Sequence, residues 1–232
     1  MQNPSFQNSL FLLSIPALLI SWAAGCKDMG VESPDTSENV RLSIRASGSV
    51  LEKPAHEVLH ITSVKILLKK ISFKQSTSDD SADVYSGPYV VDLDLSTQLH
   101  DVVATRVRPG SYDRIRFTIH KPEDQEQLPD TDFADGAGGS VRYSVVVTGA
   151  YHETPFVYKS RESARQELTF LNPLTVPESG NVHVTLRIDP YDWFTDGLLI
   201  FDPFNQSKEI DDRLKRSIAE AYRDNDRNGE PD

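Results

Sequence analysis

The densest group of oxygen-bearing side chains in this 232-residue chain lies at residues 224–232. The side chains of interest stand at the first, third, fifth, sixth, seventh and ninth places of this segment: Asp224, Asp226, Asn228, Gly229, Glu230 and Asp232. Alternate oxygen-bearing side chains can converge on one hard cation, while the glycine allows a sharp turn and the backbone carbonyl at the seventh place coordinates. The spacing therefore predicts a calcium site with ligands Asp224, Asp226, Asn228, Glu230 and Asp232.

The same spacing resembles the calcium loops of thrombospondin type-3 repeats, dockerins and EF-hands. The bidentate acidic residue at the twelfth place of an EF-hand loop has no counterpart, because the sequence printed here reaches only the ninth place. We therefore expect the body of the protein, or the α-carboxylate of Asp232, to add oxygens, or the affinity to be low, about 10⁻⁴ to 10⁻³ M. The alternative interpretation is an acidic tail surrounded by water.

Aromatic side chains stand beside carboxylates in residues 189–204, including Asp192, Trp193, Asp196 and Asp202. Such a segment could stack on a sugar and hydrogen-bond its hydroxyls, or supply the acid and base of a glycoside hydrolase. Trp193, Asp192 and Asp196 are therefore candidate ligand-binding residues. The alternative is that the aromatic residues fill the core, the commoner role of large aromatic side chains. The carboxylates could also complete the cation shell.

Basic side chains alternate along another predicted strand, at Arg114, Arg116 and His120. Arginine pairs well with carboxylates and phosphates, so Arg114 and Arg116 are candidates for binding an anionic glycan or lipid head group. The alternative is pairing across the sheet with Asp92 and Asp94.

Catalytic motifs are absent from the sequence. It contains no G-x-S-x-G motif and no glycine-rich phosphate loop, and its single cysteine is Cys26. The six histidines do not have metal-ligand spacing. We therefore expect no catalytic residue and a protein that is not an enzyme, with a glycoside hydrolase using carboxylates near Trp193 as the alternative.

The N-terminal region carries a targeting pattern. The apolar residues 10–22 precede Ala23, Ala24, Gly25 and Cys26, an arrangement typical of bacterial lipoproteins, in which the signal is cleaved before a cysteine that then receives lipid. The sequence thus predicts a signal peptide over residues 1–25 and a lipidated Cys26 with a polar tether over residues 26–38. The membrane would be a partner through this lipid, and the location would be the bacterial cell envelope, at the outer membrane or cell surface. An ordinary secretory signal is the alternative.

The charge balance restricts the class of partner. The chain has 35 acidic and 24 basic residues, a formal net charge of −11. Nucleic-acid binding needs clustered positive charge, so we expect no nucleic-acid partner. Divalent cations are compatible with this charge.

Residues 39–190 alternate between apolar and polar side chains with turn residues between the runs, which predicts an antiparallel β-sandwich of eight or nine strands. The apolar phase shifts near Lys69, which predicts a bulge. A proline–glycine turn at residues 108–111 predicts a hairpin between residues 103–107 and 112–120. Residues 76–88 and 123–139 are predicted loops.

Residues 191–232 form the last predicted unit, with the aromatic and acidic segment, a helix and the calcium-type loop. The helix is predicted because Ile210, Leu214, Ile218 and Tyr222 recur every four residues, as on one face of an amphipathic helix. Ending near Arg223, it would correspond to the entering helix of an EF-hand.

Residues 89–93 (YVVDL) and 107–117 (VRPGSYDRIRF) resemble a pattern found in a family of uncharacterised bacterial lipoproteins. The resemblance covers residues 40–190. It implies an immunoglobulin-like or transthyretin-like sandwich and no activity. We therefore expect an all-β, lipid-anchored, non-catalytic binding or structural module that presents its two long loops to a glycan or protein ligand.

Overall fold

The structure is a computed structural model that describes residues 38–47, 58–75, 81–93, 95, 96, 98–216 and 218–232. The described residues all belong to one compact unit, Asp35–Asp232. The predicted signal peptide, Cys26 and the tether up to residue 37 lie outside the described residues. In the part of the chain that is described, no helix has the length and apolar character needed to cross a membrane.

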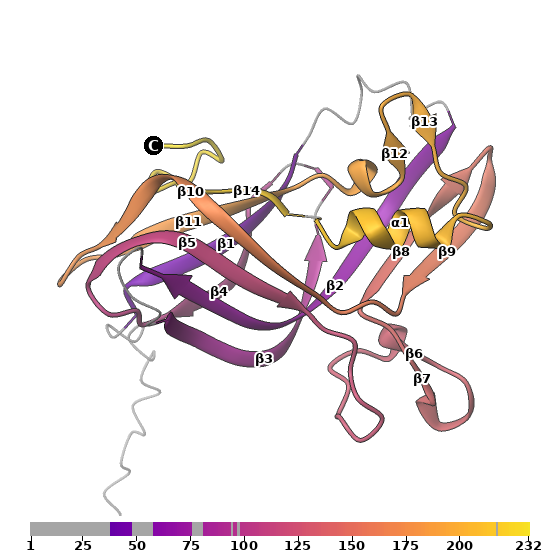
Figure 1. Ribbon diagram of the computed structural model, residues 1–232, viewed down its shortest axis with the longest axis horizontal. Coiled ribbons are helices and arrows are strands. Elements are labelled where there is room, and N and C mark those ends of the chain that lie inside the picture. Colours follow the sequence, from indigo (N-terminus) through magenta and orange to yellow (C-terminus); the bar gives the residue numbers. More distant parts are fainter. Residues whose placement is uncertain (1–37, 48–57, 76–80, 94, 97, 217) are drawn as a thin grey trace, which may run out of the picture. The chain divides into compact units, whose positions relative to one another are not determined.

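The structure is mostly β with one α-helix, and this confirms the predicted all-β sandwich (Figure 1). Sheet A has the order β14-β11-β1-β4, formed by β1 (Val40–Ala46), β4 (His100–Thr105), β11 (Val182–Ile188) and β14 (Ile218–Arg223). Sheet B has the order β10-β5-β2-β8-β9 with β3 also paired to β2, formed by β2 (Leu59–Lys74), β3 (Ser81–Leu93), β5 (Gly110–Ile119), β8 (Val145–Tyr151), β9 (Thr154–Ser160) and β10 (Ala164–Val176). All pairs in the two sheets are antiparallel except β1 with β11, which is parallel.

The remaining elements are short. Two small hairpins are formed by β6 (Ala134–Asp135) with β7 (Val141–Arg142) and by β12 (Thr195–Asp196) with β13 (Leu199–Ile200). The helices are η2 (Thr131–Phe133), η3 (Ala137–Gly139), η4 (Pro190–Trp193) and α1 (Ser207–Leu214). The Tyr158 hydroxyl of β9 donates to the Ser207 carbonyl and to Asp211, and so attaches α1 to sheet B.

Strand alternation places one face of each sheet in a single shared core. From β1 of sheet A, Leu42 and Ile44 enter this core, and from sheet B, Ile66 and Phe117 do so. Full burial of each such side chain contributes about 1.5–3 kcal/mol. The other face of β1 therefore presents polar residues outward, and this outward face of sheet A carries the candidate site described below.

The predicted bulge near Lys69 is confirmed. The registers of β2 with β3 and of β2 with β5 both shift between Leu68 and Lys70. An extra residue at this point turns the apolar side chains of both halves of a long strand toward the same core.

The predicted hairpin between residues 103–107 and 112–120 is wrong. β4 pairs with β1 in sheet A, whereas β5 pairs with β2 and β10 in sheet B. The side-chain amide of Asn39 donates to the Val107 carbonyl and accepts from the Val107 N–H, both at 2.8 Å. Because the backbone of Val107 is already bonded in this way, the following proline–glycine turn leads the chain from one sheet to the other.

The predicted long C-terminal helix is also wrong in extent. α1 ends at Leu214, and Ile218–Arg223 is strand β14. Ile218 lies in the shared core, whereas Tyr222, opposite Thr185 of β11, is buried outside that core. The register of β14 shifts near Ile218, so the two residues are buried on different faces of one strand, and their four-residue spacing only imitates a helix. No helix enters the calcium-type loop.

The two predicted loops differ in outcome. Residues 81–88 belong to β3, and residues 76–80 lie outside the described part. Residues 123–139 have only short elements, as predicted, but Phe133 is buried against Leu67 and Val146 of sheet B. The ammonium group of Lys65 also holds this segment, at 2.7 Å from both Asp130 and Asp132.

Candidate metal centre

The segment 224–232 follows β14 and covers the outward face of sheet A. Ser43 of β1 and Thr185 of β11 are register partners on this face, and both are only 1–2% exposed. Their side chains are small, and on the same strands they stand between larger residues, including Arg41, Arg45 and Arg187.

Asp224 lies at the bottom of this arrangement and is fully buried. Its Oδ2 accepts hydrogen bonds from the Thr185 hydroxyl at 2.7 Å and from the Gly229 N–H at 3.1 Å. Its Oδ1 is buried and has no hydrogen-bond partner among the described residues. A buried carboxylate oxygen without a partner is costly, since its lost hydration is not replaced.

Two further carboxylates approach Asp224. Oxygen atoms of Asp224, Asp226 and Asp232 all lie within 4.8 Å of one another. Asp226 and Asp232 are exposed, so the group is closed by protein on the Asp224 side and open on the other. Three carboxylates at this separation repel one another, and a cation between them would reverse the sign of the interaction.

The other two predicted ligands are placed differently. The Asn228 side chain accepts from the Glu230 N–H at 2.7 Å and donates to Asp226 at 2.9 Å, so its amide lies beside the carboxylate group. The Glu230 side chain is paired with Arg45 at 3.1 Å and points to β1. For Glu230 this leaves the backbone carbonyl, which is the group that the loop spacing predicted.

The segment is fixed across every strand of sheet A. Arg45 of β1 and the Tyr222 hydroxyl of β14 both donate to the Gly229 carbonyl, at 2.5 and 2.6 Å. Arg227 pairs with Asp101, the second residue of β4, at 2.6 Å. Asp232 accepts from the Asn225 N–H at 3.1 Å, which closes the segment into a loop.

Burial sets the protonation of two neighbours of the loop. Burial raises the pKa of Tyr222, so its phenol remains a donor. Burial, followed by the positive charges of Arg227 and Arg41, lowers the pKa of His183 below its ordinary value of 6.5. The imidazole is therefore neutral at pH 7 and adds no positive charge to the face that holds the carboxylates.

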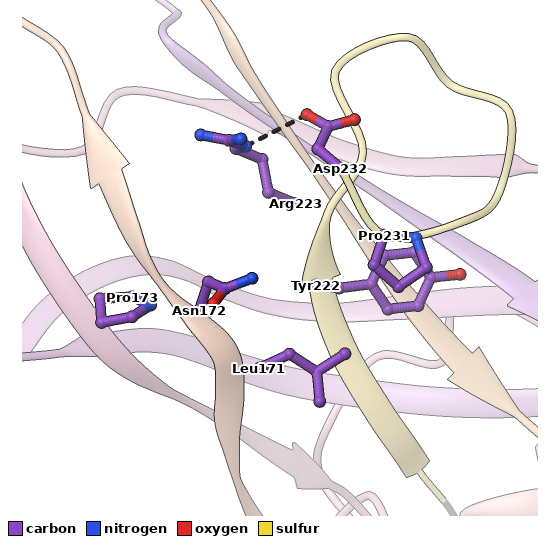
Figure 2. Close-up of a pocket in the computed structure, with 7 residues that line it drawn as sticks. All are labelled: Leu171, Asn172, Pro173, Tyr222, Arg223, Pro231 and Asp232. Atoms are coloured by element: carbon purple, nitrogen blue, oxygen red, sulfur yellow. Dashed lines mark hydrogen bonds and ion pairs between the residues drawn. The ribbon is translucent and has the colours of Figure 1, made fainter.

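A pocket of about 110 Å³ adjoins the loop (Figure 2). It is lined by Leu171, Asn172, Pro173, Tyr222, Arg223, Pro231 and Asp232. The first three come from an irregular part of β10, where the register with β5 shifts between Thr169 and Leu174. Asp232 belongs both to the pocket and to the carboxylate group.

The aromatic and acidic segment does not form an open binding platform. Trp193 is 1% exposed and Phe194 is fully buried in the shared core. Asp192 and Asp196 are exposed, and Asp196 pairs with Arg213 of α1. The structure thus places Trp193 as core, and no sugar can stack on its indole without unfolding this region.

The two candidate arginines of β5 are paired within sheet B. Glu167 of β10 accepts from Arg114 at 2.8 Å and from Arg116 Nε at 2.9 Å. Hydrogen bonding by Arg116 and then by Arg114 lowers the pKa of Glu167. The pairing of these arginines across the sheet is therefore with Glu167, whereas Asp92 of β3 lies opposite Lys65 of β2. Asp94 lies outside the described residues. His120 is only 8% exposed and contacts Glu126 at 2.6 Å.

Thr185, Arg45 and Tyr222, which hold the C-terminal loop, were not predicted. The one sequence signal for them is the run of small or basic residues on the outward face of β1 and β11, which indicates a covered face but not what covers it.

Searches of family models, of curated proteins and of solved structures return no match to this chain.

Proposed function

We propose that this chain is a lipid-anchored protein of the bacterial cell envelope that acts as a non-catalytic binding or structural module, with its C-terminal loop held by calcium. The fully buried Asp224, whose Oδ1 has no partner among the described residues, carries the metal part of the proposal. Asp226 and Asp232 each bring a carboxylate oxygen within 4.8 Å of one of Asp224. Carboxylate, amide and carbonyl oxygens are the ligands that calcium prefers.

Calcium would act as a structural staple in this role. The loop that carries the three carboxylates also contacts β1, β4, β11 and β14. A cation that neutralises the carboxylates therefore stabilises the whole of sheet A. Calcium sites of extracellular modules have a Kd of about 10⁻³ M. At a calcium concentration of about ten times this Kd, binding would stabilise the fold by about 1.4 kcal/mol.

The test is a calorimetric titration of calcium into the full chain, with thermal denaturation in calcium and in chelator. Saturable binding and a rise in Tm of about 3–6 °C are expected for the unaltered chain. Asp226→Ala removes an exposed ligand and should abolish both effects while leaving the Tm in chelator nearly unchanged. Asp224→Ala should abolish binding as well.

Asp212→Ala is the matched control, because Asp212 is an exposed aspartate on α1 whose one ion pair within the described residues is with neighbouring Lys215. It should bind calcium normally. Absence of saturable binding in the unaltered chain, or equal destabilisation of the Asp226 variant in calcium and in chelator, would reject the calcium loop.

The lipid anchor has its own test, since it depends on Cys26 and not on the loop. Cys26→Ser should abolish incorporation of labelled fatty acid and release the protein from the membrane fraction. Retention of label in the serine variant would reject lipidation at this residue, and it would leave the calcium proposal unaffected.

A further inference from the structure

The pocket beside the C-terminal loop combines apolar, amide and cationic groups. Leu171 is 61% exposed at its rim, and Pro173 and Pro231 add apolar surface. Asn172 provides a side-chain amide, and Arg223 lies at the end nearest Asp232 (Figure 2).

Arg223 retains capacity to bind an anion. Its Nε donates to Asp232 at 3.1 Å, and within the described part of the chain its two terminal nitrogens have no partner. The guanidinium is about half exposed. A planar guanidinium with free terminal nitrogens is suited to a carboxylate, which it can bind through two parallel hydrogen bonds.

The proposed cation would also have open coordination positions. Calcium takes six to eight oxygens. The described loop brings together three carboxylates, of which Asp226 and Asp232 are exposed. Oxygens from outside the described chain can therefore complete the shell, and Asp232 belongs both to this carboxylate group and to the lining of the pocket.

We propose that this pocket binds an acidic sugar through the calcium ion, so that the sugar carboxylate lies between the cation and Arg223. This inference rests on the proposed calcium loop and names its ligand. A sugar acid offers a carboxylate together with adjacent hydroxyl oxygens, which can occupy the open positions of the cation, while Asn172 can bond a further hydroxyl. The pocket, at about 110 Å³, is much smaller than the roughly 300–1,000 Å³ typical of drug-sized ligands. It therefore takes the carboxylate end of one sugar unit, and the rest of the ring lies outside it.

The test measures binding of methyl α-galacturonoside to the full chain by calorimetry, in saturating calcium and in chelator. Binding in calcium is expected to be at least about tenfold tighter than in chelator, since the cation supplies one side of the carboxylate site. Methyl α-galactoside, which has the same ring without the carboxylate, should bind at least about tenfold more weakly. N-acetylglycine separates a sugar acid from an amino-acid carboxylate and should also bind more weakly.

Leu171→Asp places a negative charge at the pocket rim without altering a loop contact. It should weaken galacturonoside binding by about tenfold or more, while calcium binding is retained or tightened. Leu198→Asp is the matched control, because Leu198 is 91% exposed and does not line the pocket. It should change neither binding constant.

The possible failures are distinguishable. If calcium binds and galacturonoside does not, the inference is overturned and the calcium loop stands. If calcium does not bind, both fall. Equal galacturonoside binding in calcium and chelator, equal binding of the neutral galactoside, no effect of Leu171→Asp, or equal binding of N-acetylglycine would each overturn the acidic-sugar site.

Discussion

Replacing Gly229 by alanine should destabilise the fold through two separable effects. Gly229 has φ of +82°, in the left-handed region that residues with a Cβ rarely adopt. An added Cβ would also lie 2.4 Å from Arg45 Nη1 and 2.8 Å from Arg45 Cζ. The arginine must therefore move, and it would lose its hydrogen bond to the Gly229 carbonyl.

The magnitude follows from these two effects. The left-handed backbone costs about 1–2 kcal/mol for a residue with a Cβ. Loss of a hydrogen bond from a charged donor costs about 1.5–3 kcal/mol, reduced here because the Arg45 side chain is flexible and 22% exposed. The ion pair with the exposed Glu230 adds little. We expect a total of about 2–4 kcal/mol and, for a domain of this size, a fall in Tm of about 5–15 °C.

The assay is chemical and thermal denaturation in chelator, with Gly197→Ala as the matched control. Gly197 has φ of +61°, and a Cβ there would meet nothing within 4 Å. It should lose only the backbone contribution of about 1–2 kcal/mol. In an Arg45→Ala background, the destabilisation caused by Gly229→Ala should fall to the same backbone cost, about 1–2 kcal/mol, because the contact with Arg45 is already gone. Equal losses for the two glycine variants, or full additivity with Arg45→Ala, would refute the reasoning.

Two further outcomes follow from contacts elsewhere in the fold. Gln166 is 6% exposed, donates to the Leu214 carbonyl at 3.1 Å and accepts from the Ile218 N–H at 3.0 Å. Gln166→Leu should lower the free energy of unfolding by about 2–5 kcal/mol in urea denaturation, because two buried backbone groups lose their partner. A loss below about 1 kcal/mol would contradict this. The backbone hydrogen bond at η2 and then the Lys65 ammonium lower the pKa of Asp130 below its ordinary 3.8. A carboxyl whose pKa is lower in the folded than in the unfolded state stabilises the fold at any pH above its unfolded-state pKa. This stabilisation is lost as the pH falls through its folded-state pKa. Asp130→Asn should therefore cost about 0.5–1 kcal/mol near pH 7 and nothing well below pH 3.8, and a difference from the unaltered chain that persists in acid would contradict the assignment.

Local sequence patterns predicted the features that depend on local geometry. Two-residue alternation identified the buried faces of β1, β5 and β11 because burial on one side of a sheet imposes that period. The spacing of Asp224, Asp226 and Asp232 predicted that their carboxylates would meet, and they do so within 4.8 Å.

The errors arose where burial has more than one cause. Ile218 and Tyr222 are both buried, one in the shared core and one beneath the C-terminal loop, and a hydrophobic period cannot distinguish these from one helical face. Trp193 beside acidic residues fitted either a sugar platform or a core, and only its tertiary surroundings decide.

The contacts that hold the loop could not be read from the sequence at all. Arg45 contacts Gly229 across 184 positions, and Thr185 contacts Asp224 across 39. Such pairs have no local signal, because they depend on which strands become neighbours. The sequence therefore predicted which carboxylates meet and missed the residues that position them.

The parallel pairing of β1 with β11 has a consequence for how the chain folds. The parallel partner of Val40 is Val182, 142 positions later, and β14 joins β11 later still in the sequence. Contacts so distant along the chain make folding slow, because the entropy cost of closing long loops comes before the strands form any stabilising hydrogen bonds and side-chain contacts. During synthesis β1 has only β4 as a sheet A partner until β11 is made, so a chain that ends before residue 182 contains only the β1 and β4 strands of this sheet. Slow acquisition of structure suits the proposed export, since a secretion channel needs an unfolded chain.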